Sequence, residues 1–207
     1  MPIGERDPKP DLDRLVFFSD GVFAIAITLL ALDLRLPPHE GPMTASGLAQ
    51  ALVALLPRFL AFVVSFQVVG IFWLAHHRAF ALIAGFNRGL AFLNLLFLMT
   101  IAFMPFPTVL VGEYGTLTTA AAFYGASLVA ASLTSNVLWV YVLRRQLLAP
   151  HTTRADIRAV SARGVVSLAM FMASIPLAFV QPLFAELTWL SVALVMPLVE
   201  RLARRPR

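Results

Sequence analysis

The chain contains no cysteine among its 207 residues, which excludes a disulfide framework, thiolate metal sites and cysteine nucleophiles. Charged residues are also scarce, at 13%, whereas water-soluble domains usually contain about 25%. The hydrophobic fraction is 59%, and the mean hydropathy is +0.83. Such a chain has too few polar atoms to coat a water-soluble globule, so an ordinary cytosolic enzyme is excluded.

Long apolar runs fill most of the sequence. A bilayer core about 30 Å thick requires roughly 20 mostly apolar residues per spanning helix. The sequence predicts an all-α integral membrane protein with six transmembrane helices in one domain over residues 14–205. The predicted spans are about 15–36, 48–78, 89–111, 116–143, 164–179 and 183–199. Residues 1–13 combine charged residues with three prolines and are predicted to form a mobile cytoplasmic tail.

Prolines and polar residues mark details within these spans. Pro105 and Pro107 predict a kink or a frayed end in the third span, and Gln181 with Pro182 separates the fifth span from the sixth. Isolated polar residues in apolar spans most often form hydrogen bonds between helices. This expectation applies to Ser19, Thr28, Ser65, Gln67, Asn94, Asn136 and Gln181.

The basic residues indicate the orientation in the membrane. Six spans place both termini on one side, and 14 of the 16 Lys and Arg residues fall there, leaving Arg35 and Arg58 on the other. Because cytoplasmic loops are enriched in basic residues, both termini are predicted to be cytoplasmic. The net charge of +5 is spread in clusters between apolar runs, so nucleic-acid binding is not expected. Preference for Arg over Lys, with abundant Ala and Leu, suggests a GC-rich bacterial genome. The predicted location of this multi-pass protein is therefore the bacterial plasma membrane.

Two short segments carry a resemblance to a known family. Residues 14–20 read RLVFFSD and fit the pattern R-x-x-x-F-S-D at the start of the first span. Residues 73–78, at the end of the second span, read WLAHHR. This chain resembles the transmembrane protein 175 family, the lysosomal-type potassium channels and their bacterial relatives. A single copy of the motif, where animal members have two, is similar to the bacterial form that assembles as a homotetramer.

The resemblance implies a potassium-selective cation channel that conducts passively through a pore lined by the first helix of each subunit. Apolar side chains form the filter in this family, and the T-V-G-Y-G segment of ordinary potassium channels is absent here. The constriction carries over to Ile25, Leu29 and Leu32. Permeating potassium would pass Ile25, Thr28 and Leu29, and no other metal and no cofactor is expected.

Helix geometry gives an independent expectation, because successive residues turn by about 100°. Taking Ile25 as zero, Leu29 lies near +40°, Leu32 near −20° and Thr28 at about −60°, so they share one side. Asp20 lies about 140° away and should point into the protein. A polar network of Arg14, Phe18, Ser19, Asp20, Trp73 and His77 is predicted to hold the first helix against the second. Asp33 is a candidate for concentrating cations at the outer mouth.

Other functions stay open at this point. A proton-coupled secondary transporter could use Asp20 and the pair His76 and His77 as a relay, although no internal repeat is visible. An enzyme is not expected, because H-E-x-x-H and G-x-S-x-G motifs are absent. A purely structural membrane subunit would show no flux of any solute. The apolar side of the first helix, taken alone, is also compatible with packing against other helices or lipid.

Overall fold

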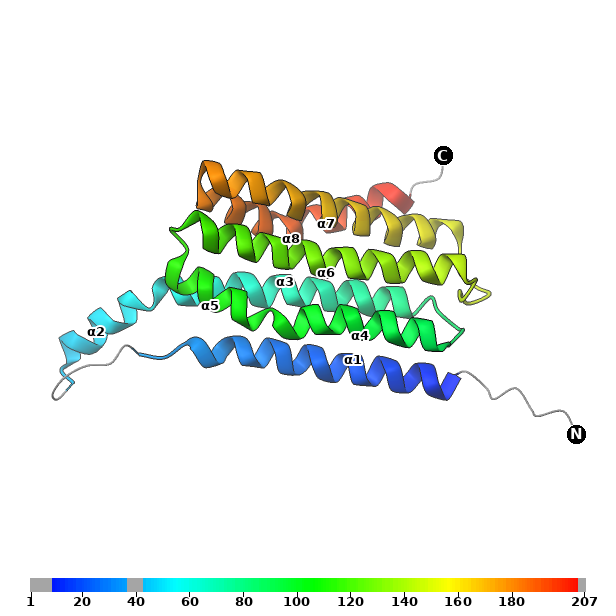
Figure 1. Ribbon diagram of the computed structural model, residues 1–207, viewed down its shortest axis with the longest axis horizontal. Helices are drawn as coiled ribbons and strands as arrows, with labels where there is room; N and C mark the ends of the chain where they lie inside the picture. Colours follow the sequence, from blue (N-terminus) through cyan, green and yellow to red (C-terminus); the bar gives the residue numbers. More distant parts are fainter. Residues whose placement is uncertain (1–8, 37–42, 205–207) are drawn as a thin grey trace, which may run out of the picture.

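The computed structural model of the protein describes residues 9–36 and 43–204, and these residues form an elongated bundle of helices (Figure 1). Six helical segments are long and apolar enough to cross a membrane, which confirms the predicted number of spans. The segments are Lys9–Asp33, Leu56–Phe80, Arg88–Tyr114, Thr118–Arg144, Arg154–Val180 and Pro182–Arg204. The first and the last described residues, Lys9 and Arg204, lie at the same end of the bundle, called the termini end below.

The first span consists of α1 (Lys9–Leu30) followed by the 3₁₀ helix η1 (Ala31–Asp33). Residues 9–13, predicted as part of the tail, belong to α1, because proline fits the first turn of a helix and Pro10 stands there. The rest of the predicted tail, residues 1–8, lies outside the described residues. The helical part ends at Asp33, before the predicted limit at Leu36.

The predicted second span, 48–78, is not one continuous helix. The structure divides it into α2 (Ala45–Ala54) and α3 (Leu56–Phe80), with Leu55 between them and a proline in the first turn of α3. A proline removes a backbone donor, so the helix is interrupted just before it. Helix α2 projects beyond the bundle at the end opposite the termini (Figure 1), and α3 alone makes the span.

The third span is interrupted as predicted. Helix α4 (Arg88–Phe103) ends one residue before Met104, and α5 (Pro105–Tyr114) begins with Pro105. Helix α6 is Thr118–Arg144, α7 is Arg154–Val180, and α8 is Pro182–Arg204. Helix α7 begins ten residues before the predicted limit, because Thr153 and Asp156 form a capping box at its start.

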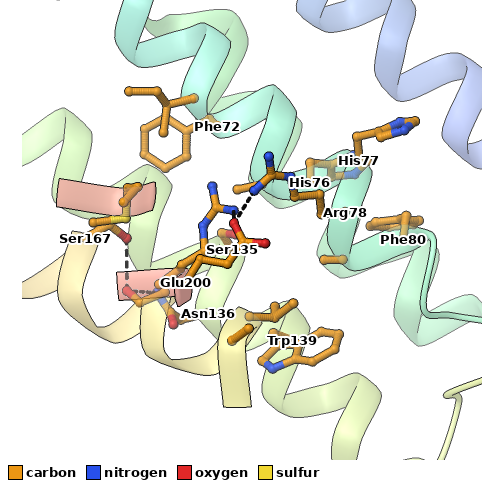
Figure 2. Close-up of a pocket in the computed structure, with 18 of the residues that line it drawn as sticks. Phe72, His76, His77, Arg78, Phe80, Ser135, Asn136, Trp139, Ser167 and Glu200 are labelled. Atoms are coloured by element: carbon orange, nitrogen blue, oxygen red, sulfur yellow. Dashed lines mark hydrogen bonds and ion pairs between the residues drawn. The ribbon is translucent and has the colours of Figure 1, made fainter. Parts of the chain in front are cut away.

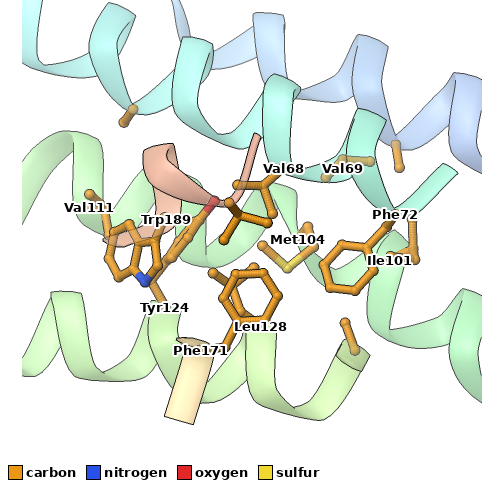
Figure 3. Packing of buried hydrophobic residues seen from close by; sticks show 14 of the residues in the cluster. Val68, Val69, Phe72, Ile101, Met104, Val111, Tyr124, Leu128, Phe171 and Trp189 are labelled. Carbon is orange, nitrogen blue, oxygen red and sulfur yellow. The ribbon is translucent and has the colours of Figure 1, made fainter. Parts of the chain in front are cut away.

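The core lies among α3 to α8, and α1 packs along its edge against α3 and α4. Figure 3 shows Tyr124, Trp189, Phe171 and Leu128 meeting in the middle of this core. The rings of Tyr124 and Trp189 lie 4.3 Å apart between centroids. Helix α7 packs mainly on α8 and α6, and α8 packs mainly on α7 and α3. Helix α1, packed on α3 and α4, has one side in the protein and one side free.

Candidate pore helix and its polar anchor

Helix α1 has two sides of different character. Ser19, Phe23, Ala26 and Leu30 are buried, with exposed fractions of at most 2%. These positions recur every three or four residues and therefore form one side of the helix. That side packs against α3 and α4 and fixes the rotation of α1 about its own axis.

The opposite side carries the apolar residues predicted to form the constriction. Ile25 is 61% exposed, Leu29 41% and Leu32 57% in the single chain. Thr28 is exposed beside them, and its hydroxyl donates to the carbonyl of Ile25 at 2.8 Å. The sequence analysis predicted a hydrogen bond between Thr28 and another helix. Among the described residues, Thr28 forms no such bond. The structure thus leaves this row of side chains free for another molecule, another copy or lipid.

The far end of this row bears one acid and one base. Asp33 is half-buried in η1, and Arg35 donates from Nε to the carbonyl of Leu32 at 2.9 Å. No ion pair joins Asp33 to Arg35 among the described residues. The carboxylate of Asp33 is therefore not neutralised by Arg35 at contact distance.

Asp20 connects α1 to α3. Its Oδ1 accepts a hydrogen bond from Trp73 Nε1 at 2.8 Å, and the Trp73 ring contacts the ring of His77 with centroids 5.7 Å apart. Asp20 therefore points away from the exposed apolar row, as helix geometry predicts. His77 supports Trp73 by ring contact and forms no hydrogen bond with Asp20.

A second chain of hydrogen bonds, built on the buried side chains of His76, Asn94 and Ser19, runs beside this contact. His76 Nε2 and Asn94 Oδ1 are 2.9 Å apart, Asn94 Nδ2 donates to Ser19 Oγ at 2.9 Å, and Ser19 donates to the carbonyl of Leu15 at 2.8 Å. Because the amide nitrogen of Asn94 is directed at Ser19, its oxygen faces His76 and accepts a hydrogen bond from Nε2–H. The chain links α1, α3 and α4 through neutral groups.

The structure brings together only part of the predicted network. Ser19, Asp20 and Trp73 hold α1 in place, whereas Arg14 and Phe18 are exposed. Arg14 forms no hydrogen bond or ion pair within the described part of the chain. Asn94 is the central residue that the predicted network omitted, and the signal for it was an uncharged polar residue in an apolar span. The predictions of interhelical bonds for Ser65 and Asn136 are likewise confirmed, through Tyr124 and Gly164.

The comparison with known proteins decides the family. The family described as "Endosomal/lysosomal potassium channel TMEM175" matches residues 14–105. A Streptomyces collinus protein named as a potassium channel is 42% identical over 172 residues, covering 81% of this chain and 82% of its own. A Chamaesiphon minutus protein, also named as a potassium channel, is 34% identical over 97% of this chain and 98% of its own. The chain belongs to the TMEM175 family.

A solved relative extends the similarity of this TMEM175 protein to the fold. The crystal structure of a lysosomal potassium-selective channel TMEM175 homologue from Chamaesiphon minutus superposes with a TM-score of 0.79 at 30% identity. It covers 92% of this chain and 98% of that one. The family match at residues 14–105 contains the apolar row of α1, the Asp20–Trp73 contact and Asn94. The protein is thus a multi-pass membrane protein of an ion-channel family.

Proposed function

We propose that this protein is a subunit of a homotetrameric potassium channel, in which α1 of each copy lines a central pore. The observation that carries the proposal is the exposed apolar row of Ile25, Leu29 and Leu32 on a helix whose other side is anchored in the protein. The full-length relatives named as potassium channels support the choice of ion. Conduction is passive, and the protein is not an enzyme.

The proposed filter acts through hydration. Four copies of Ile25, Leu29 and Leu32 around an axis would form rings of apolar side chains with no group to replace the water of a permeating ion. Narrow apolar constrictions can expel water and thereby close a pore. A potassium ion is larger and less strongly hydrated than sodium, so the cost of partial dehydration is lower. The expected result is a moderate preference for potassium, with Thr28 supplying a hydroxyl at the edge of the rings and Asp33 attracting cations outside them.

The proposed orientation places the termini end in the cytoplasm of a bacterial cell. The described basic residues at the opposite end are Arg35 and Arg58, and Arg58 is paired with Glu113 at 3.0 Å. The termini end holds most of the basic residues, which is the arrangement expected for a cytoplasmic side (Figure 1). The bilayer and potassium ions are the other partners in this proposal.

The contacts of Asp20 and His76 favour a channel over a proton-coupled transporter. Asp20 is bound by Trp73, and His76 by Asn94. A proton relay requires titratable groups that exchange protons with each other, whereas these two are each held by a neutral partner. Their geometry suits the positioning of α1.

The test is ion flux into proteoliposomes under a potassium gradient, with sodium and N-methylglucamine gradients for comparison. The wild-type protein is expected to conduct potassium faster than sodium and to exclude the organic cation. Ile25→Asn and Leu29→Asn should raise the sodium flux and reduce the preference about tenfold or more, because an amide hydrates the constriction. A tenfold change corresponds to about 1.4 kcal/mol.

Leu194→Asn is the matched control, since Leu194 is 75% exposed on α8 and lies outside the proposed pore. It should leave potassium and sodium fluxes at the wild-type ratio. Identical permeability of the wild type and both α1 variants would show that the filter is assigned to the wrong residues. Saturable uptake that depends on a proton gradient would replace the channel with a transporter.

A further inference from the structure

A second feature of the molecule lies outside the pore helix, in a cavity between α3, α6, α7 and α8. Its volume is about 480 Å³, within the usual range for small-molecule sites of roughly 300–1,000 Å³. Its lining includes the apolar side chains of Phe72, Phe171, Val192 and Met196, and the charged side chains of Arg78, Arg163, Glu200 and Arg204. Figure 2 shows Arg78 and Glu200 close together and Phe72 apart from them. The cavity thus has an apolar interior and a charged rim.

Three arginines from three helices meet at this rim around one carboxylate. Glu200 Oε2 accepts from Arg78 of α3 and, at 2.8 Å, from Arg163 of α7, while Glu200 Oε1 lies 3.4 Å from Arg204 Nε. Arg204 also donates to Asp156 at 3.0 Å. Three guanidinium groups face two carboxylates, so the rim keeps an excess of positive charge.

The arginines have more donors than their partners can accept. Each guanidinium carries five N–H groups in a planar fork that fits a phosphate with two parallel hydrogen bonds. Glu200 is the only hydrogen-bond partner of Arg163 within the described part of the chain, although the Arg163 side chain is only 11% exposed. A partly buried cation with most of its donors unused is favourable for binding a second anion.

The position of the cavity selects the kind of anion. The apolar lining residues belong to segments that span the membrane. Arg78 and Arg204 stand in the last turn of their segments, and Arg163 of α7 directly precedes the charge-free run 164–180. A basic pocket between transmembrane helices, with apolar walls beneath it, is suited to an anionic lipid whose headgroup stays at the surface and whose chain enters the protein. A soluble phosphate compound would use the rim and leave the apolar interior empty.

We propose that the cavity between α3, α6, α7 and α8 binds an anionic glycerophospholipid. Arg78 and Arg163 hold the phosphate, Arg204 contributes charge at the edge, and an acyl chain fills the space beside Phe72, Phe171 and Met196. Glu200 keeps the arginines in place and competes with the phosphate for them. This binding site is separate from the proposed pore and does not depend on the function assigned to α1.

The experiment measures lipid binding to the purified, assembled protein by native mass spectrometry. The probes are dioctanoyl phosphatidylglycerol, dioctanoyl phosphatidylcholine and glycerol 3-phosphate. The first should bind about tenfold more tightly than the zwitterionic lipid. Both lipids carry an ionised phosphodiester, but the choline cation of the zwitterionic lipid is repelled by the excess positive charge of the rim. It should also bind more tightly than glycerol 3-phosphate, which lacks the acyl chains.

Four variants connect the binding to this cavity. Arg78→Gln with Arg163→Gln should weaken phosphatidylglycerol binding about tenfold, and Ala75→Phe should weaken it by filling the cavity wall. Arg201→Gln is the matched control, because Arg201 is exposed at the same end and does not line the cavity. Glu200→Gln should strengthen binding, since it frees the arginines.

The opposite effects of the arginine and Glu200 variants separate lipid binding from a simple loss of folding. The thermal midpoint and the elution volume of each variant are measured beside its lipid affinity, to show that the variant is folded and assembled. A gain in binding cannot arise from an unfolded protein. Equal affinity for the two lipids overturns the proposal, as does an Arg201→Gln loss equal to that of the double variant. Binding of glycerol 3-phosphate as tight as the lipid would assign the rim to a soluble phosphate and overturn the lipid assignment.

Discussion

Asn94 joins three helices through one side chain. It lies on α4 and contacts Ser19 of α1 and His76 of α3, with no exposed surface of its own. Water is absent from the interior of a bilayer, so a buried polar group without a partner in the protein is costly. This single residue therefore fixes how the proposed pore helix sits on the rest of the bundle.

Replacing Asn94 with Leu tests this role. The variant leaves His76 Nε2 and Ser19 Oγ without their present partners, and each unsatisfied buried group is costly. We expect a loss of about 1 to 3 kcal/mol in the free energy of unfolding. Denaturation in mixed micelles, followed by circular dichroism, provides the measurement. Thr134→Ala is the control, because Thr134 bonds only carbonyls of its own helix. Equal losses in both variants would contradict the role of Asn94.

Residue-level geometry was predictable where it depends on one helix and unpredictable where it depends on two. The turn of about 100° per residue placed Asp20 away from the row of Ile25, and the Trp73 contact agrees with that direction. The sequence analysis placed His77 in the network, whereas His76 is the buried histidine bonded to Asn94. Neighbouring residues differ by the same 100°, and the packing of α4 decides which faces inward. Asn94 lies 75 positions from Ser19 along the chain, so no local pattern connects them.

At the scale of helices, the apolar runs predicted the number of spans, while charged or proline-containing flanks were misassigned. The segment from Arg154 to Arg163 was excluded from the fifth span because of its arginines, yet α7 continues through it. A membrane helix can extend beyond the bilayer, where charges are solvated. Conversely, the run from 48 was joined to the second span because it is apolar, although a new helix begins at Leu56 with Pro57 in its first turn. Hydropathy predicts which residues lie within the bilayer, whereas capping residues and prolines determine where the helices begin and end.

The contact between α6 and α7 depends on a glycine. A Cβ atom added to Gly164 would lie 2.3 Å from Asn136 Oδ1, and Asn136 Nδ2 donates to the carbonyl of Gly164 at 3.0 Å. Small residues allow membrane helices to approach closely. Gly164→Ala should therefore displace Asn136 and lower the free energy of unfolding by about 1 to 3 kcal/mol.

Gly70→Ala is the comparison, because a Cβ atom there has nothing within 4 Å. Alanine favours a helix over glycine by about 1 kcal/mol, so this variant should be neutral or more stable. Thermal midpoints of both variants in the same detergent give the result. A midpoint for Gly164→Ala at or above that of Gly70→Ala would mean that α6 and α7 separate without loss.

On the scale of the whole molecule, α1 lies at the edge of the bundle, with one side packed on α3 and α4 and the other side exposed. Helices α6, α7 and α8 enclose a core with Tyr124 and Trp189, while α1 stands at the edge with Ile25, Leu29 and Leu32 exposed. Lipid can cover apolar side chains as well as protein can, so exposure alone does not require a partner. The rotation of α1 is fixed by its polar contacts with α3 and α4, so the row of Ile25, Leu29 and Leu32 always faces away from the bundle.

Cysteine cross-linking tests whether these rows meet in an assembly. The chain has no cysteine, so Leu29→Cys gives one thiol per copy, and thiols around a narrow axis fall within reach of each other. A disulfide requires Cα atoms within about 7 Å, and a short bifunctional thiol reagent extends that range. Leu29→Cys in membranes should form covalent dimers with the reagent, and modification should block potassium flux. Leu194→Cys is the control, because it also replaces an exposed leucine, on α8. This variant should stay monomeric on a denaturing gel. Cross-linking at Leu194 without cross-linking at Leu29 would place α8, and not α1, at the contact between copies, and the apolar row of α1 would then face lipid.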